Sequence, residues 1–168
     1  LATKESVYGY LAIAGGFVVK NFFNSVSTLA KGKIGPNEGK KISLNDEIIF
    51  NKENVISKNF SVKMALEKVN SVRVIKGPQY DYFSKSSQKE FFSSNYKVTN
   101  LTDRMGMRLE GPAIKNVVST NIRSEGISKG AIQVPADGQP IVLLNDHPTI
   151  GGYPKIAYIT SADYDLLI

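Results

Sequence analysis

The stretch that decides the fold is residues 124–160, SEGISKGAIQVPADGQPIVLLNDHPTIGGYPKIAYIT. Two apolar runs within it, residues 141–144 and 155–160, have the length and composition of β-strands. A loop rich in glycine and proline precedes each run, at residues 135–139 and 145–154. Because loops held by strands are where binding and catalytic groups usually lie, we expect the functional site in this stretch.

Polar side chains on or beside these loops are the candidates for chemistry. Asp146 is a candidate general base, and its alternative role is to cap a turn. Gln133 could hydrogen-bond a substrate amide, or it could be an ordinary surface glutamine. Tyr153, in the second loop, completes the predicted catalytic set. His147, the one histidine of the chain, is expected to be an exposed loop residue without a chemical role.

Five further residues are candidates for holding a substrate: Arg104, Arg108, Thr149, Gly151 and Gly152. Arginine suits two-pronged recognition of a carboxylate, and strand alternation would put positions 104 and 108 on one face. We expect one arginine to point into a groove and the other to pair with Glu110 or Glu125. The N–H groups of the two glycines could form an anion-binding nest, the alternative being a tight turn.

The composition excludes several classes of protein. The chain has 168 residues and no cysteine, so disulfides, thiolate catalysis and cysteine-ligated metals are excluded, and a single histidine argues against a metal site. The net charge of +6 comes mainly from scattered lysines, which indicates a solvated surface rather than a nucleic-acid interface. No apolar run reaches eighteen residues, and the first residues do not resemble a signal peptide. We therefore expect a cytoplasmic protein that contacts no membrane.

The rest of the chain reads as short strands separated by glycine and proline turns. Strands are expected at residues 8–17, 72–75, 96–100 and 107–110, with Leu11 and Ile13 buried, and a hairpin is expected at residues 42–50 with its turn at residues 45–46. A helix of about two turns is expected after Ser84 as its N-cap, and another helix begins near residues 160–163. The aromatic residues around the first helix are expected to anchor the core: Tyr82, Phe83, Phe91 and Phe92. The pattern predicts a mainly β, barrel-like fold with a few short helices.

Four dense motifs carry a resemblance to a known family: RVIKGPQYDYF at residues 73–83, TDRMGMRLEGP at 102–112, SEGISKGAIQVPADGQPIVLL at 124–144 and GGYPKIAYITSAD at 151–163. With YLAIAGGF at 10–17, they resemble the biotin-dependent carboxyltransferase-like family. That family includes the C-type subunit of bacterial 5-oxoprolinase, also called the KipI antagonist KipA, and allophanate hydrolase subunit 2. It is also similar to part of urea carboxylase.

The resemblance implies cyclophilin-like β-barrel subdomains. Residues 1–60 would be the C-terminal part of a first subdomain, residues 61–71 a connecting strap, and residues 72–168 most of a second subdomain. The chain would then be a fragment of a longer family member.

The resemblance also implies three possible functions. The first is a component of an ATP-dependent 5-oxoprolinase, which opens a cyclic amide to glutamate with a KipI-like B-type subunit and a LamB/YcsF-like A-type subunit. The second is the carboxyltransferase component of a biotin-dependent urea or amide carboxylase, with carboxybiotin presented in trans. The third is a non-enzymatic binder of a KipI-like kinase inhibitor. No cofactor would be bound covalently, and ATP would act in the assembled complex.

Overall fold

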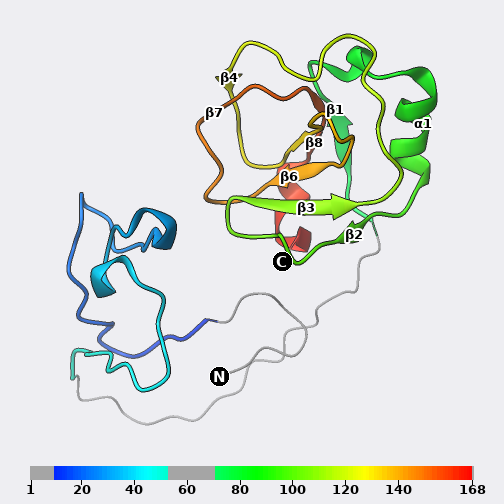
Figure 1. The fold of residues 1–168 in the computed structure, drawn as a ribbon. Helices are drawn as coiled ribbons and strands as arrows, with labels where there is room; N and C mark the ends of the chain where they lie inside the picture. Colours follow the sequence, from blue (N-terminus) through cyan, green and yellow to red (C-terminus); the bar gives the residue numbers. More distant parts are fainter. Residues whose placement is uncertain (1–9, 53–70, 168) are drawn as a thin grey trace. The chain divides into compact units, whose positions relative to one another are not determined.

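The computed structural model describes residues 10–52 and 71–167 of the chain (Figure 1). The chain divides into two compact units, Leu1–Ala65 and Leu66–Ile168, which we call unit 1 and unit 2 and describe separately. The predicted connecting strap, residues 61–71, lies outside the described residues except for Ser71.

The described part of unit 1 consists of turns, isolated β-bridges and two single-turn 3-10 helices, η1 (Ala30–Gly32) and η2 (Asn37–Gly39). The predicted strand at 8–17 and hairpin at 42–50 are wrong where the structure describes them, since Phe17 and Phe50 form only a single bridge. Leu11 and Ile13, expected to be buried, are 62% and 37% exposed. An alternating pattern becomes a strand only where a neighbouring strand pairs with it and a layer covers its apolar face.

Unit 2 is built on an antiparallel sheet of six strands in the order β1-β8-β5-β6-β3-β2 (Figure 1). The strands are β1 (Val74–Lys76), β2 (Lys97–Val98), β3 (Gly106–Glu110), β5 (Ala131–Gln133), β6 (Ile141–Leu143) and β8 (Lys155–Ile159). A separate pair of two-residue strands, β4 (Glu125–Gly126) and β7 (Ile150–Gly151), forms a small ribbon. The prediction of a mainly β protein is confirmed.

The core of unit 2 lies around β5 and β8, the two strands in which nearly every residue is buried. Such strands read as continuous apolar runs because neighbours cover both of their faces. Phe83 packs against them and is only 2% exposed, while Tyr82 and Phe91 are half-buried at the edge of the core. Phe92 is 52% exposed, so the predicted anchor is wrong there. Consecutive helical residues point in different directions, so Phe91 and Phe92 cannot both face the core.

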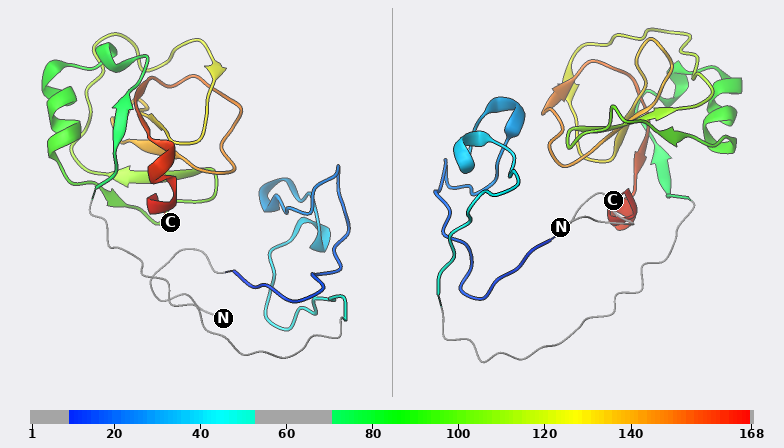
Figure 2. Two further views of the ribbon diagram at one scale, coloured as in Figure 1. Left: turned by 180° about the vertical axis from the view of Figure 1, so that it is seen from behind. Right: turned by 60° about the horizontal axis from the view of Figure 1, so that its bottom comes forward.

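The helix α1 (Lys85–Ser93) begins where the sequence predicts it. The Ser84 Oγ accepts a hydrogen bond from the N–H of Ser87 at 3.1 Å, which confirms the predicted N-cap. The buried Gln88 side chain donates to the carbonyls of Tyr80 and Phe83, both at 3.0 Å, and so fastens the helix to the 3-10 turn η3 (Tyr80–Tyr82) before it. In Figures 1 and 2, α1 and the β4–β7 ribbon lie on opposite sides of unit 2.

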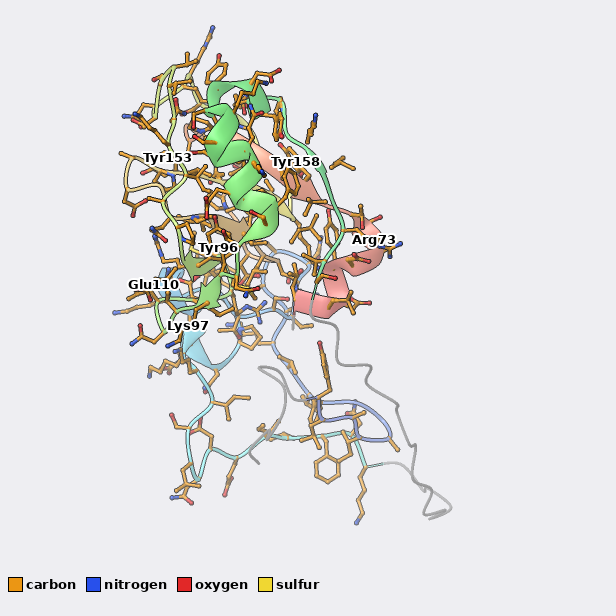
Figure 3. All side chains as sticks on the ribbon, turned by 90° about the vertical axis from the view of Figure 1, so that its right-hand side faces the viewer. Arg73, Tyr96, Lys97, Glu110, Tyr153 and Tyr158 are labelled. Atoms are coloured by element: carbon orange, nitrogen blue, oxygen red, sulfur yellow. The ribbon has the colours of Figure 1, made fainter. Side chains whose placement is uncertain are left out.

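The last described element is the 3-10 helix η4 (Ser161–Leu167), which is fastened to the residue before β1 by a clasp between Asp163 and Arg73. Asp163 Oδ2 accepts the backbone N–H of Arg73 at 2.6 Å, and Oδ1 accepts a hydrogen bond from its Nη2 at 2.5 Å. Asp163 is 2% exposed, whereas the Arg73 side chain lies outward beside η4 (Figure 3). The hydrogen bonds from the Arg73 side chain, and then from its backbone, hold the pKa of Asp163 below its ordinary value.

Asp163→Asn is expected to lower the unfolding temperature at pH 7 and to flatten the acid dependence of stability. A carboxyl whose pKa is lower in the folded state stabilises the fold above its unfolded pKa, and this contribution is lost as the pH falls through the folded pKa. The unfolding temperatures of wild type and variant should therefore converge between about pH 5 and pH 2. Thermal unfolding followed by circular dichroism checks this, with the exposed Asp165→Asn as control. Curves that stay parallel to acid pH would contradict the assignment.

Candidate functional site

A buried lysine is the centre of the most unusual group of polar side chains in unit 2. Lys155, the first residue of β8, is 1% exposed. Its Nζ forms an ion pair with Oε1 of Glu125 on β4 and donates to the Tyr153 carbonyl at 3.4 Å. Buried charges are found in proteins only where they are paired, and this pair is contributed by two different sheets.

Gln79, in the turn after β1, joins both members of this pair. Its Oε1 accepts the backbone N–H of Lys155 at 3.1 Å, and its Nε2 donates to Glu125 Oε1 at 3.0 Å. Glu125 Oε1 therefore receives hydrogen bonds from two side chains. Gly77, two residues earlier, lets the turn approach β8, because a Cβ there would lie 2.3 Å from the Lys155 carbonyl oxygen.

Gln133 is the third nitrogen donor of the group. It lies opposite Lys155 in the β5–β8 pairing, next to a register shift, so the two side chains belong to neighbouring positions of adjacent strands. Gln133 is 5% exposed, and its Nε2 has no hydrogen-bond partner in the described part of the chain. The surface alternative for Gln133 is wrong. A buried unsatisfied donor costs about 1–3 kcal/mol, so the Gln133 amide is a candidate for donating to an oxygen of a ligand.

Gly151 closes this group from the β7 side. A Cβ at Gly151 would lie 2.7 Å from Gln133 Nε2 and 3.0 Å from Ile127 Cδ1, so a larger residue would have to displace the ends of both side chains. Gly151 pairs directly with Glu125 in the β4–β7 ribbon. Neither Gly151 nor Gly152 has a positive φ, so the predicted anion nest is not formed and the glycine serves close approach instead. We call the group formed by Gln79, Glu125, Gln133, Gly151 and Lys155 the Lys155 cluster.

The electrostatics of the cluster are those of one ion pair with additional donors. The hydrogen bond from Lys155 lowers the pKa of Glu125, with a smaller contribution from Gln79, so Glu125 is ionised at neutral pH. Burial raises the pKa of Tyr158, and the charge of Glu125 raises it further, which places this phenol within the field of the carboxylate. The cluster therefore contains one positive charge, one negative charge and an amide donor that lacks an acceptor among the described residues.

Two of the predicted site residues form a separate pair. Arg104 donates from Nε to Asp146 Oδ2 at 2.6 Å and from Nη2 to Oδ1 at 3.0 Å. The Asp146 N–H also donates to the Arg104 carbonyl at 2.9 Å, extending the β3–β6 pairing into the loops. The predicted pairing of an arginine with Glu110 or Glu125 is wrong for Arg104, because the β3–β6 register brings its loop to Asp146. Both oxygens of the Asp146 carboxylate therefore accept hydrogen bonds from the Arg104 guanidinium.

Three other predicted site residues, Arg108, Thr149 and Tyr153, form their hydrogen bonds through backbone atoms. Arg108 is exposed on β3, and its N–H donates to Thr102 Oγ1 at 3.1 Å. Thr149 is exposed, and its carbonyl accepts the Ile127 N–H at 3.1 Å. Tyr153 is 41% exposed and reaches the Lys155 cluster through its carbonyl, while the ring is a surface group (Figure 3). The structure thus brings together Gln133, Gly151 and the Tyr153 backbone.

Lys155, Glu125 and Gln79 are the cluster residues that are absent from the predicted catalytic and substrate-binding sets, although Lys155 is one of the polar side chains beside the second predicted loop. One signal for Lys155 was available, since it is a lysine that opens an apolar run expected to be a buried strand. Glu125 and Gln79 give no such signal, because only the tertiary fold brings their turns to β8. Within residues 10–52 and 71–167, no group of three or more His, Cys, Asp or Glu side chains could hold a metal ion. Over the same ranges, every helix is too short or too polar to cross a membrane.

Comparisons with known proteins give consistent relatives. A family model described as the carboxyltransferase domain, subdomain A and B, matches residues 2–168. The C-type subunit of 5-oxoprolinase from Escherichia coli K12 is 39% identical over 160 residues, which are 95% of this chain and 52% of that protein. The C-type subunit from Haemophilus influenzae is 33% identical over 165 residues, covering 98% of this chain and 53% of the relative. The chain thus spans about half the length of these relatives.

A solved structure shares the fold. The Kluyveromyces lactis urea carboxylase superposes with a TM-score of 0.73 at 26% identity, over 89% of this chain and 15% of that one. A related enzyme is also similar in sequence: urea amidolyase of Lachancea kluyveri is 30% identical over 179 residues, covering 92% of this chain and 10% of that protein.

Proposed function

We propose that this chain is part of the C-type subunit of a 5-oxoprolinase. It belongs to the family described as the carboxyltransferase domain, subdomain A and B. The complex would hydrolyse the cyclic amide of 5-oxoproline to glutamate in an ATP-dependent reaction. The two relatives named as C-type subunits of 5-oxoprolinase support this choice, since they match over nearly the whole chain. A KipI-like B-type subunit and a LamB/YcsF-like A-type subunit would complete the assembly, in the cytoplasm.

The observation that carries the proposal is the buried Lys155 beside the Gln133 amide, whose Nε2 has no partner among the described residues. Lysine ammonium and amide N–H groups are donors to oxygen, and both are removed from water here, where such donors act most strongly. The substrate 5-oxoproline carries its polar oxygens on a lactam carbonyl and a carboxylate. The Lys155 cluster would therefore bind and orient this substrate by its oxygens, and the partner chains would supply the nucleotide.

The test is ATP-dependent release of glutamate from 5-oxoproline by the full-length protein, reconstituted with its A-type and B-type partners. We expect turnover only when all three components and ATP are present. A stable complex without glutamate release would overturn the oxoprolinase proposal. In that outcome a regulatory binder of a KipI-like kinase inhibitor becomes the leading function.

A carboxyltransferase role is the second candidate, and the likeness to urea amidolyase and urea carboxylase favours it. In that reaction carboxybiotin would arrive in trans and donate its carboxyl group to a urea-like amide. Release of free biotin from carboxybiotin in the presence of urea, without ATP or partner chains, would identify this activity. The two enzyme candidates differ in substrate and in their need for ATP, so the two assays separate them.

A further inference from the structure

The hydrogen bonds of the Lys155 cluster are unevenly shared between the two oxygens of Glu125. Lys155 Nζ and Gln79 Nε2 both donate to one oxygen, Glu125 Oε1. The other Glu125 oxygen accepts no hydrogen bond from the described residues, and Gln133 Nε2 has no acceptor there either. Glu125 therefore satisfies two of the three nitrogen donors and leaves the third unsatisfied. A group with two well-placed acceptor oxygens could satisfy all three.

The donors and the acceptor differ in how firmly they are held. Lys155 and Gln133 are buried on β8 and β5, two adjacent interior strands of the sheet. Glu125 is on the β4–β7 ribbon, which is separate from that sheet and has strands of only two residues. The Glu125 side chain is 44% exposed. The Glu125 side chain can turn fully into water, where its charge stays hydrated. The Lys155 side chain is enclosed by the fold and cannot reach water in the same way. The acceptor is thus the replaceable member of the pair.

Replacement of Glu125 imposes a condition on the replacing group. Removing one partner of a buried ion pair leaves an uncompensated charge, which is strongly unfavourable. Only another anion restores the balance around Lys155. A carboxylate also has two oxygens, one for the place of Glu125 Oε1 and one for the unsatisfied Gln133 amide.

We propose that Glu125 occupies, as an internal competitor, a binding site for the carboxylate of a small-molecule ligand formed by Lys155, Gln79 and Gln133. Ligand binding and the Glu125–Lys155 contact exclude each other, so the free chain is held in a self-blocked state. The inference rests on the proposed function in one respect, namely that the ligand is 5-oxoproline, bound through its carboxylate. The remote carboxylate would then anchor the substrate and leave its lactam ring for chemistry.

The test is calorimetric titration of the full-length protein at neutral pH with three probes. The probes are 5-oxo-L-proline, 2-pyrrolidinone, which is the same lactam without the carboxylate, and tetrahydrofuran-2-carboxylate, which has a ring and a carboxylate but no lactam. The variants are Glu125→Gln, which removes the competing charge and keeps the side-chain shape, and Lys155→Met, which removes the anchor. Glu110→Gln and Lys97→Met are matched controls on β3 and β2, well apart from Tyr153 in Figure 3.

Glu125→Gln is expected to bind 5-oxo-L-proline and tetrahydrofuran-2-carboxylate at least about tenfold more tightly than wild type, because the self-blocked population no longer competes. Binding of 2-pyrrolidinone should not change, and Glu110→Gln should behave as wild type. Lys155→Met should abolish the tightening when combined with Glu125→Gln. Glu125→Gln leaves the buried Lys155 without its anion, so thermal unfolding of this variant is measured before the titrations. Glu125→Asp is the second variant: it keeps the charge on a shorter side chain and should show a smaller tightening of carboxylate binding.

Several outcomes would overturn the inference. Unchanged or weaker carboxylate binding in Glu125→Gln would show that Glu125 does not compete. Equal tightening of 5-oxo-L-proline and 2-pyrrolidinone would assign the cluster to the lactam carbonyl. Absence of binding by both carboxylates in every variant would also overturn it. If only tetrahydrofuran-2-carboxylate shows the tightening, the carboxylate site stands and 5-oxoproline as its ligand is wrong.

Discussion

Exchanging Lys155 for methionine is expected to lower kcat/KM for 5-oxoproline about a hundredfold in the reconstituted complex. The Lys155 ammonium is the one charged donor in the cluster, and it is removed from water, so no solvent interaction replaces it. Methionine keeps the length and apolar stem of the side chain. If Lys155 anchors a carboxylate remote from the reacting bond, most of the loss will be in KM. Steady-state glutamate release over a range of 5-oxoproline concentrations separates the two parameters.

Two further variants test whether the loss is specific to Lys155. Lys97→Met removes an exposed lysine from β2 and should leave kcat/KM within about twofold of wild type. Asp146→Asn tests the alternative site, since Asp146 is the predicted general base and is paired with Arg104. We expect a smaller loss for Asp146→Asn than for Lys155→Met. The reverse order would place the chemistry at the Arg104–Asp146 pair and demote the Lys155 cluster to a structural role.

Exchanging Phe83 for alanine is expected to reduce the free energy of unfolding of unit 2 by about 3–5 kcal/mol. Phe83 is 2% exposed and packs in the cluster that includes Val134 and Ile156, so truncation removes buried apolar contacts and leaves a cavity. A loss of this size is a large part of the stability of a small domain. Urea unfolding followed by tyrosine fluorescence measures it.

Phe92→Ala is the matched control for this prediction, because Phe92 lies in the neighbouring helix α1 but is 52% exposed. It should cost less than about 1 kcal/mol. Equal losses in the two variants would mean that the helix α1, rather than the core contact of Phe83, determines the stability of unit 2.

Local sequence signals were sufficient to locate helices and strands in unit 2, where neighbouring elements pack against them. The apolar runs at 141–144 and 155–160 became β6 and β8 to within one residue, and Ser84 became the N-cap of α1. In unit 1 similar signals failed, since the run at 10–17 forms no strand. The difference is physical: a strand is stabilised by its partner and by a covering layer, which the alternation of a single segment does not encode.

The candidate site was predicted in part for the same reason. Gln133 and Gly151 were found because both lie in loops or strands with evident turn chemistry. Their roles were not found, because the close approach of Gly151 to Gln133 depends on the ribbon pairing of β4 with β7. The ion pair of Lys155 with Glu125 joins residues of two sheets, and neither residue carries a local motif. Sequence patterns locate such loops, and tertiary packing decides which of their polar groups meet.

The clasp between Arg73 and Asp163 has a consequence for how unit 2 folds. Its two residues are 90 positions apart, and they bring the beginning of β1 to the helix that follows β8. The strand β1 is synthesised before the other strands of the sheet, but its pairing partner β8 is synthesised last. β1 therefore cannot pair until β8 is available. Closing so long a loop is slow relative to forming the β5–β6 hairpin. Docking of β1 is thus expected to be a late step in folding and an early one in unfolding, visible as fast amide exchange in β1.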